Sequence, residues 1–340
     1  MFRWFLFGLF LSLSFTAGSL GAQEVRPAII YDTELIMDGS WNEAILKGIK
    51  KFEKRTGVPV KIEIARNYDE HTQKMNDFAK QGYNPILLSG SILTQKKIRK
   101  AVIDHPKTRF IIFNGIFNLP NAYYFSFSYH TSSFLAGYLS AAKTKSGKLG
   151  FIGGMEIPTI KNFLCGYIAG AKYQNPDIQV EHTYVGHDSN AWTRPDRARE
   201  IALEQIERGA DVIFSPSGGS SIGALKAAHE KSVLGVGVDM NQNHLYPGSI
   251  LTSVMVRVDN AAYRALMTAH RNIWGEQRKV MGLQEKGVEL AFDQHNEGLI
   301  PSALKKEIEQ LESDIILGKV TVPYYEGAKE CLVNGKTLFK

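Results

Sequence analysis

Short β-branched and aromatic runs alternate with amphipathic helical stretches through most of this chain. The first runs are AIIYD (28–32), VKIEI (60–64), PILLS (85–89) and FIIFN (110–114). Helical patterns lie between them, at about 41–55, 70–82 and 92–104. This order predicts βαβ units, and therefore a parallel sheet with helices on both faces.

The same series restarts in the second half of the chain. The later strand candidates are KLGFIGG (148–154), QVEHTYV (179–185), DVIFS (211–215) and VLGVGVD (233–239). Helical patterns again separate them, at about 158–173, 194–208 and 219–231. A chain of 340 residues is long enough for about two domains. We therefore expect two similar α/β lobes and not one long sheet.

The N-terminal stretch MFRWFLFGLFLSLSFTAGSLGAQE differs from the rest. One arginine precedes an apolar run that ends near residue 15, and small residues follow. This pattern predicts a signal peptide over residues 1–22, cleaved after Ala22, because the run is short for a transmembrane span. No cysteine lies near the cut, so we expect a soluble periplasmic protein and not a lipoprotein. An uncleaved membrane anchor is the alternative.

A signal peptide followed by two α/β lobes is the outline of a type I periplasmic binding protein, with two Rossmann-like lobes and a hinge. We assign the N-terminal lobe to 23–128 plus about 256–287. The C-terminal lobe then covers 129–255 plus about 288–323, and 324–340 form a tail. Ligands of open α/β sheets bind beyond the carboxyl ends of the strands, and closure of two facing lobes buries them.

Charge and cysteine content exclude several classes of function. Without Arg3 the mature chain has 39 basic and 34 acidic side chains, a net charge of +5. These charges are interspersed, which favours solvated helix faces over a nucleic-acid surface.

Cys165 lies in an apolar helical pattern, so buried free thiols at Cys165 and Cys331 are favoured over a disulfide, which remains the alternative. No H-E-x-x-H or C-x-x-C motif occurs, and we expect no catalysis, metal or cofactor.

Two tryptophans flank predicted helix starts. In LIMDGSWNEA (35–44), Ser40 and Glu43 fit a capping box, which leaves Trp41 at a first helical position that is usually exposed. In HDSNAWTRPDRA (187–198), Trp192 precedes a second predicted capping box, formed by Thr193 and Asp196. One indole from each lobe would suit stacking on both faces of a flat ring. Packing of Trp192 on Ala198 is the structural alternative.

Polar residues follow the predicted strands at the same edge. Asp32 ends the first strand, Asp38 and Asn42 lie just beyond it, and Asp239 ends a strand of the second lobe. These positions suit ligand groups, and Asx-turns are the alternative interpretation. The stretch SPSGGSSIGALKAA (215–228) opens a helix with free backbone N–H groups that could hold an anion or hydroxyl oxygens, although it is not a P-loop.

Several segments resemble those of one family. They are DGSWNEA (38–44), SSFLAGYLSAA (132–142), GFIGGMEIPTIKNFLCGYIAGA (150–171), GVGVDMNQ (235–242) and TSVMVRVDNA (252–261). The chain thus resembles the basic membrane protein family over about 27–323. This family includes a purine nucleoside receptor of a bacterial ABC importer, in which two phenylalanines, one from each lobe, sandwich the base.

The resemblance implies roles for individual residues. Trp41 and Trp192 take the places of the two phenylalanines. Asp32 matches a ligand-contacting aspartate, and Asp239 matches the aspartate that grips the ribose hydroxyls. Gly218 and Gly219 lie beside it in the family's pattern.

The chain also departs from the family. Thr33 replaces an expected asparagine, Ser128 stands where a base-contacting acid is expected, and Val256 replaces a lysine. Each loss would leave a buried hydrogen-bonding group of a purine nucleoside unpaired, at about 1–3 kcal/mol. A flat aromatic ligand is therefore better supported than its identity, and a free purine base or riboflavin remains open.

These observations predict a monomeric binding protein, not an enzyme, that presents a nucleoside-like ligand to an inner-membrane ABC permease. A sensor subunit that delivers the same ligand to a membrane receptor is the alternative.

Overall fold

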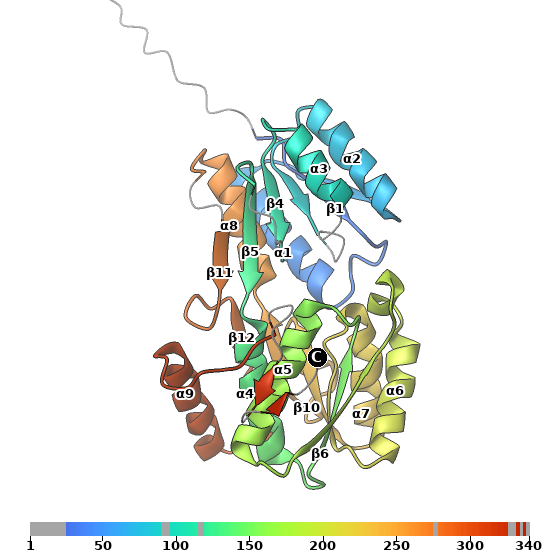
Figure 1. The fold of residues 1–340 in the computed structure, drawn as a ribbon, viewed down its shortest axis with the longest axis vertical. Helices are drawn as coiled ribbons and strands as arrows, with labels where there is room; N and C mark the ends of the chain where they lie inside the picture. Colours follow the sequence, from blue (N-terminus) through green and yellow to red (C-terminus); the bar gives the residue numbers. More distant parts are fainter. Residues whose placement is uncertain are drawn as a thin grey trace, which may run out of the picture.

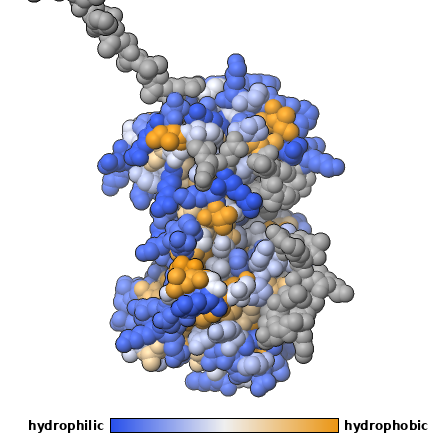
Figure 2. Space-filling view, turned by 60° about the vertical axis from the view of Figure 1, so that its left-hand side comes forward, coloured by the Kyte–Doolittle hydropathy of each residue, from blue (hydrophilic) through white to orange (hydrophobic). Residues whose placement is uncertain are grey.

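The computed structural model describes residues 25–89, 96–114, 119–274, 278–325, 331–333 and 336–337. These residues form two six-stranded sheets and one two-stranded sheet. The two large sheets belong to separate lobes that lie end to end (Figure 1), and Figure 2 shows a narrower waist between the lobes. The two-lobe α/β fold predicted from the sequence is confirmed.

The first lobe contains an entirely parallel sheet. Its strands are β1 (Ala28–Tyr31), β2 (Lys61–Ile64), β3 (Ile86–Leu88), β4 (Phe110–Phe113), β5 (Ala122–Phe127) and β11 (Arg278–Met281). They pair in the order β11-β5-β4-β3-β1-β2. Every residue of β1, β3 and β4 is buried, which explains their unbroken apolar sequences, because helices cover both faces of a parallel sheet.

Four helices cover this sheet. They are α1 (Trp41–Thr56), α2 (Tyr68–Lys80), α3 (Lys96–Asp104) and α8 (Val258–His270). Ile29 of β1 packs in the same core as α1 and α8, whereas Ile30 packs with α2 and α3, so the pairs of helices lie on opposite faces. A Cβ at Gly48 of α1 would lie 2.2 Å from the Asp259 carbonyl oxygen, and glycine therefore allows α1 and α8 to approach closely.

The sheet of the second lobe has a strand order that corresponds to that of the first. Its strands are β6 (Lys148–Gly153), β7 (Gln179–Tyr184), β8 (Val212–Phe214), β9 (Leu234–Asp239), β10 (Ile250–Val256) and β12 (Val288–Leu290). The order is β12-β10-β9-β8-β6-β7. All pairings are parallel except that of β12 with β10. The chain passes from one sheet to the other after β5, after β10 and after β11.

The helices of the second lobe include one very close pair. The α-helices are α4 (Tyr129–Lys143), α5 (Pro158–Gln174), α6 (Pro195–Glu207), α7 (Ser221–Glu230) and α9 (Ser302–Ile316). Short 3-10 helices are η2 (Ser189–Trp192), η3 (Gly218–Ser220), η4 (Asn243–Leu245) and η5 (Glu297–Leu299). A Cβ at Gly170 of α5 would lie 1.8 Å from the Phe134 carbonyl oxygen, so α4 and α5 touch backbone to backbone.

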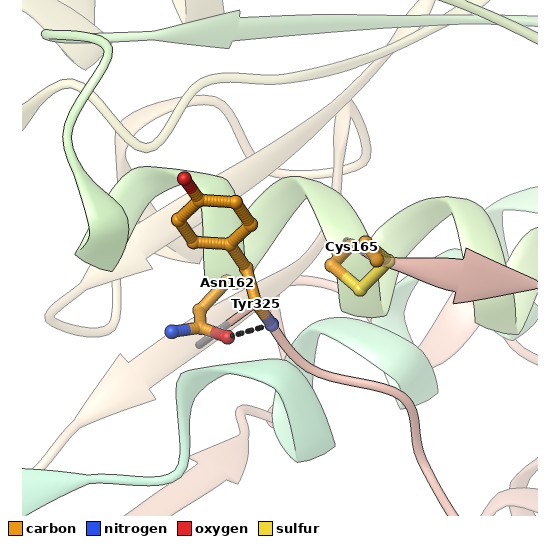
Figure 3. The surroundings of a disulfide bond; sticks show 4 residues. Asn162, Cys165 and Tyr325 are labelled. Carbon is orange, nitrogen blue, oxygen red and sulfur yellow. Dashed lines mark hydrogen bonds between the residues drawn. A yellow bond between two sulfur atoms is a disulfide. The ribbon is translucent and has the colours of Figure 1, made fainter. Parts of the chain in front are cut away.

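A disulfide attaches the C-terminal segment to α5. Cys165 and Cys331 are bonded, with their Cα atoms 5.8 Å apart, and the prediction of free thiols is wrong. Cys165 is buried as expected, but the strand β13 (Leu332–Val333), paired with β14 (Lys336–Thr337), begins beside it (Figure 3). The backbone N–H of Tyr325 also donates to Asn162 of α5, at 2.7 Å. Sequence patterning marked Cys165 as buried but gave no sign that the distant C-terminal segment covers this face.

Candidate ligand-binding site

A cavity of about 330 Å³ lies between the two lobes. The first lobe lines it with residues that follow β1 and β4 and with the start of α1. The second lobe contributes the start of α5, the end of η2 and the end of β9. The cavity thus lies at the carboxyl ends of parallel strands, which is the usual place for a ligand in this fold.

Trp41 lines the cavity from the first lobe. Its ring packs edge-on against Phe113 of β4 and Phe127 of β5, with centroids 6.5 and 5.9 Å away and planes inclined by 84° in both cases. Edge-to-face packing of this kind is favourable and fixes the plane of a ring. The large side chain at the start of α1 is therefore held by two phenylalanines of the sheet beneath it.

Trp192 lines the cavity from the second lobe. Its ring lies against Gly154, where a Cβ would be 2.1 Å from the ring atom Cζ3. Gly218, with φ of +61°, also lines the cavity and lies beside the same indole. The structure therefore brings both predicted tryptophans to one cavity, and two glycines provide the space for the second.

Asp38 caps α1, which corrects the capping box expected from Ser40 and Glu43. Its carboxylate accepts hydrogen bonds from the backbone N–H groups of Ser40, Asn42 and Glu43, at 2.8–3.2 Å. Ser40 makes no side-chain cap, and the Glu43 carboxylate accepts from the Gly39 N–H instead. An aspartate two residues earlier satisfies the free N–H groups of the helix, because its ionised carboxylate is the stronger acceptor.

The second predicted capping box is also absent. The N-cap of α6 is Arg194, which makes no side-chain cap. The Thr193 hydroxyl donates to the Asn190 carbonyl oxygen within η2, and the Ser220 hydroxyl accepts from the Arg194 N–H at 2.7 Å. The preceding turn takes Thr193 as its own C-cap, so the helix begins one residue later than the sequence pattern indicates.

Asn42, Asp32 and Thr33 also line the cavity. The Asn42 amide is fixed within the first lobe, since it donates to Asp38 at 3.0 Å and accepts from the Ser89 hydroxyl at 3.2 Å. The Thr33 hydroxyl oxygen accepts from the Leu35 N–H at 3.1 Å. Two of these three predicted residues therefore have hydrogen bonds that hold the loop after β1 in shape.

Asp239 lines the cavity at the end of β9 and joins the lobes. Its backbone has φ of +62°, and its carboxylate accepts a 2.5 Å hydrogen bond from the Ser40 hydroxyl of the first lobe. Beside it, the Gln242 amide donates to the Gly39 carbonyl oxygen across the same boundary, at 3.0 Å. These two bonds hold the loop before α1 against the end of β9.

Burial raises the pKa of two carboxyl groups in this cavity. The pKa of Asp239 rises to about 7, because burial disfavours its charge and Asp38 adds repulsion, while the Ser40 hydrogen bond opposes the shift. Burial also raises the pKa of Asp38, against the four hydrogen bonds that its carboxylate accepts. Both carboxyl groups therefore ionise less readily than a free aspartate, and no basic side chain is among the described residues that line the cavity.

Two predicted site residues are not among those that line the cavity. Gly219 lies next to the lining, where a Cβ would be 3.2 Å from both the Asp38 Cβ and the Trp192 carbonyl oxygen. Ser128 lies at the crossing between β5 and α4, where its N–H donates to the Met281 carbonyl oxygen.

The structure adds Asn114 and Tyr129 to the site. Asn114 follows β4 with φ of +61°, and the Tyr129 hydroxyl donates to its Oδ1 atom at 2.5 Å. This bond directs the Asn114 amide group, whose N–H groups have no acceptor among the described residues and could donate to a ligand. The signal was present in the sequence, because Asn114 ends the run FIIFN as Asp32 ends AIIYD. Phe163 and the first residues of α5 complete the apolar side of the cavity.

The sequence of this chain matches the model of one protein family over most of its length. The model named ABC transporter substrate-binding protein PnrA-like matches residues 27–326. The chain belongs to this family. Proteins of this family bind small molecules and act with membrane permeases, which is the general role of the present chain.

Curated relatives cover almost the whole sequence. Basic membrane protein A1 of Borrelia garinii is 31% identical over 339 residues, which is 96% of each chain. Basic membrane protein B of Borreliella burgdorferi is 29% identical and covers 97% of each. Within the described residues of the present chain, no helix combines the length and apolar character needed to cross a bilayer.

Solved structures share the fold at low sequence identity. An ABC transporter solute-binding protein from Aeropyrum pernix K1 is 20% identical with a TM-score of 0.80, over 90% of this chain and 95% of that one. A solute-binding protein from Conexibacter woesei is 19% identical with a TM-score of 0.70, over 88% and 99%. A transcriptional activator of the comK gene from Bacillus halodurans, at 20% identity over 87% and 99%, has a TM-score of 0.74, so this fold alone does not define a function.

Proposed function

We propose that this member of the PnrA-like family is a receptor that captures a flat, nucleoside-like aromatic ligand between Trp41 and Trp192. One observation carries the proposal: two tryptophans, one from each lobe, line a single cavity. Stacking on an aromatic side chain contributes about 1–3 kcal/mol for each nucleic-acid base. Two such stacks, from opposite lobes, would couple capture of the ligand to closure of the lobes.

Hydrogen-bonding groups around the cavity then set the orientation of the ligand. Asp32 and Asp239 would accept from hydroxyl or amine groups, and the Asn114 amide would donate to a ring acceptor. A purine nucleoside offers both kinds of group at the two ends of a flat molecule. We therefore take purine nucleosides as the first ligands to examine, with free purine bases and riboflavin as the competing flat ligands.

Isothermal titration calorimetry with purified protein tests this function. Adenosine, guanosine, adenine and riboflavin are compared with ribose and an aliphatic amino acid. The proposal requires binding of at least one flat ligand that is lost in Trp41→Ala and Trp192→Ala. Binding of ribose or the amino acid alone would reject it, and so would release of a chemically altered nucleoside after incubation, because the protein is proposed to bind without turnover.

We also propose that the protein is exported and that it delivers its ligand to a permease. Residues 1–22 would be removed as a signal peptide, and the mature protein would work in the periplasm and hand its ligand to an inner-membrane permease. Apolar residues on the face shown in Figure 2 form separate small patches, which favours a monomer. The intact mass of protein purified from its own cells checks the export step: it should equal that of residues 23–340, whereas an added lipid mass would contradict a non-lipidated product.

A further inference from the structure

Acidic but not basic side chains are found among the described residues that line the interlobe cavity. Asp32, Asp38 and Asp239 line it, and no lysine, arginine or histidine is among the described residues that do. The electrostatic character of the cavity is therefore negative.

Two of these carboxylates are deeply buried. Asp38 is 4% and Asp239 is 8% exposed. Within the described part of the chain, the hydrogen-bond partners of these two carboxylates are backbone N–H groups, an amide and a hydroxyl, and none of them is a basic side chain. Buried charges are normally paired with an opposite charge, since an unpaired charge away from water is costly. A positively charged ligand would supply the pairing that the protein itself lacks.

Helix N-termini do not cancel this negative charge. The first N–H groups of α1 already donate to Asp38. The start of α5 also lines the cavity, and a helix N-terminus acts as about half a positive charge. Pro158 at the first position of α5 has no N–H to donate. One such partial charge is smaller than the charge of the two buried carboxylates together, so the cavity stays negative when both are ionised.

The aromatic lining favours the same kind of ligand. Trp41, Trp192, Tyr129 and Phe163 surround the cavity. The face of an aromatic ring attracts cations, most strongly in the case of tryptophan, by about 0.5–2 kcal/mol per ring. Stacking alone would accept any flat ring, whereas stacking together with carboxylates discriminates by charge.

We infer that the cavity selects a flat heteroaromatic ligand that carries a positive charge, in preference to neutral or anionic molecules of the same shape. This inference rests on the proposed capture of a flat ring between Trp41 and Trp192 and adds the charge of that ring. An anion such as a nucleotide would meet Asp38 and Asp239 without a basic partner. A cation would leave both carboxylates paired.

Two matched series of ligands test the inference by calorimetry at a pH just above the pKa of Asp239 and below the pH at which 1-methyladenosine loses its charge. The first series is 1-methyladenosine, adenosine and adenosine monophosphate, which are cationic, neutral and anionic. The second is 1-methylnicotinamide, nicotinamide and nicotinate, with the same order of charges on a single ring. The cation of each series should bind at least about tenfold more tightly than its neutral counterpart, which is about 1.4 kcal/mol, and the anion more weakly still.

Two variants test whether the preference for a cationic ligand arises from the carboxylates of the cavity. In Asp239→Asn the ratio of cation to neutral affinity should fall toward one, a readout that does not depend on the overall affinity of the variant. The control is Asp177→Asn, an exposed aspartate in the turn after α5, which should keep the ratio of the original protein.

The two proposals fail in different ways. If adenosine binds as tightly as 1-methyladenosine and nicotinamide as tightly as 1-methylnicotinamide, the charge preference is overturned while the capture of nucleosides stands. If no nucleoside binds but 1-methylnicotinamide binds more tightly than nicotinamide, the nucleoside-like ligand is rejected and the charge preference stands. Absence of binding in both series contradicts both proposals.

Discussion

The hydroxyl group of Ser40, in the first lobe, donates a 2.5 Å hydrogen bond to the carboxylate of Asp239, in the second. The Gln242 amide donates to the Gly39 carbonyl oxygen beside it. Ser40 immediately precedes Trp41, so the link between the lobes adjoins one of the two indoles. Contact between the lobes and the shape of the ligand cavity therefore depend on the same short loop.

Removal of the Ser40 hydroxyl should weaken ligand binding. Ser40→Ala deletes a hydrogen bond to a buried carboxylate, and bonds to charged groups contribute about 1.5–3 kcal/mol. The Asp239 carboxylate then lacks the donor that the first lobe supplies. We expect affinity to fall by about tenfold to a hundredfold, mainly through faster release, as measured by stopped-flow fluorescence. The matched control is Ser133→Ala, because the buried Ser133 hydroxyl has no partner within the described residues. Equal affinities in the two variants would contradict a role for the Ser40 bond.

Truncation of either cavity tryptophan should reduce affinity without unfolding the protein. Trp41→Ala and Trp192→Ala each remove one stacking surface, and we expect at least a tenfold weaker complex from each. Trp274→Phe is the control, because Trp274 does not line this cavity and packs against Tyr123. Calorimetry gives the affinities, and the thermal unfolding midpoint checks the fold. Affinities within twofold of the original in both alanine variants would eliminate the stacking role.

A methyl group at Gly154 should displace the second indole. The added Cβ of Gly154→Ala would lie 2.1 Å from the Trp192 ring, so the ring must move. We expect ligand affinity to fall at least about tenfold, at a cost of about 1–3 kcal/mol in stability from overpacking. Gly186→Ala is the control, since its Cβ would be an ordinary 3.4 Å from Ala191. An unchanged affinity in Gly154→Ala would show that the position of Trp192 is unimportant for binding.

The buried Asp239 should make stability depend on pH in a defined direction. Its pKa rises from 3.8 in the unfolded chain to about 7 in the folded protein, so the folded state binds the proton more tightly. The contribution of Asp239 to the free energy of unfolding therefore decreases as pH rises from about 4 to about 7 and is constant above that. Denaturant unfolding of the original protein and of Asp239→Asn across this range should give curves that diverge with rising pH. Parallel curves would mean that the pKa is not raised.

The disulfide should stabilise the second lobe measurably. Cys165 and Cys331 are 166 positions apart in sequence, and replacement of both by alanine should lower the free energy of unfolding by about 2–4 kcal/mol. Denaturant unfolding measures the loss. Alkylation of the unreduced, unfolded protein checks the bond itself: it should label neither cysteine, and labelling of both would show that the thiols are free.

The two-lobe fold could be predicted from the sequence because the periodicity of its strands and helices is strong. The runs AIIY, ILL and FIIF are buried on both faces, and amphipathic helical patterns lie between them, so element type was clear. The strands β11 and β12 were not predicted. They have only three or four residues each, too few to show a periodic pattern, and they form the edges of the two sheets.

Site residues that directly follow a strand could be predicted from the sequence. Contacts that depend on packing between distant segments could not. Asp32, Trp41, Trp192 and Asp239 were predicted from strand ends, helix starts and a family resemblance, and all line one cavity. The first capping box was wrong because the Asp38 carboxylate accepts from the same N–H groups, and the second because Thr193 ends the preceding turn, neither of which a four-residue motif shows. The disulfide was missed because a contact over 166 positions leaves no local signal.

We expect one flat molecule to lie between Trp41 and Trp192. The most direct test is a crystal structure of the protein purified without unfolding, so that it retains the ligand captured in the cell. We expect planar density in contact with both indole rings, with Asp239 beside it. A bound aliphatic molecule, or a planar one that touches neither indole, would contradict the proposed capture between the two tryptophans.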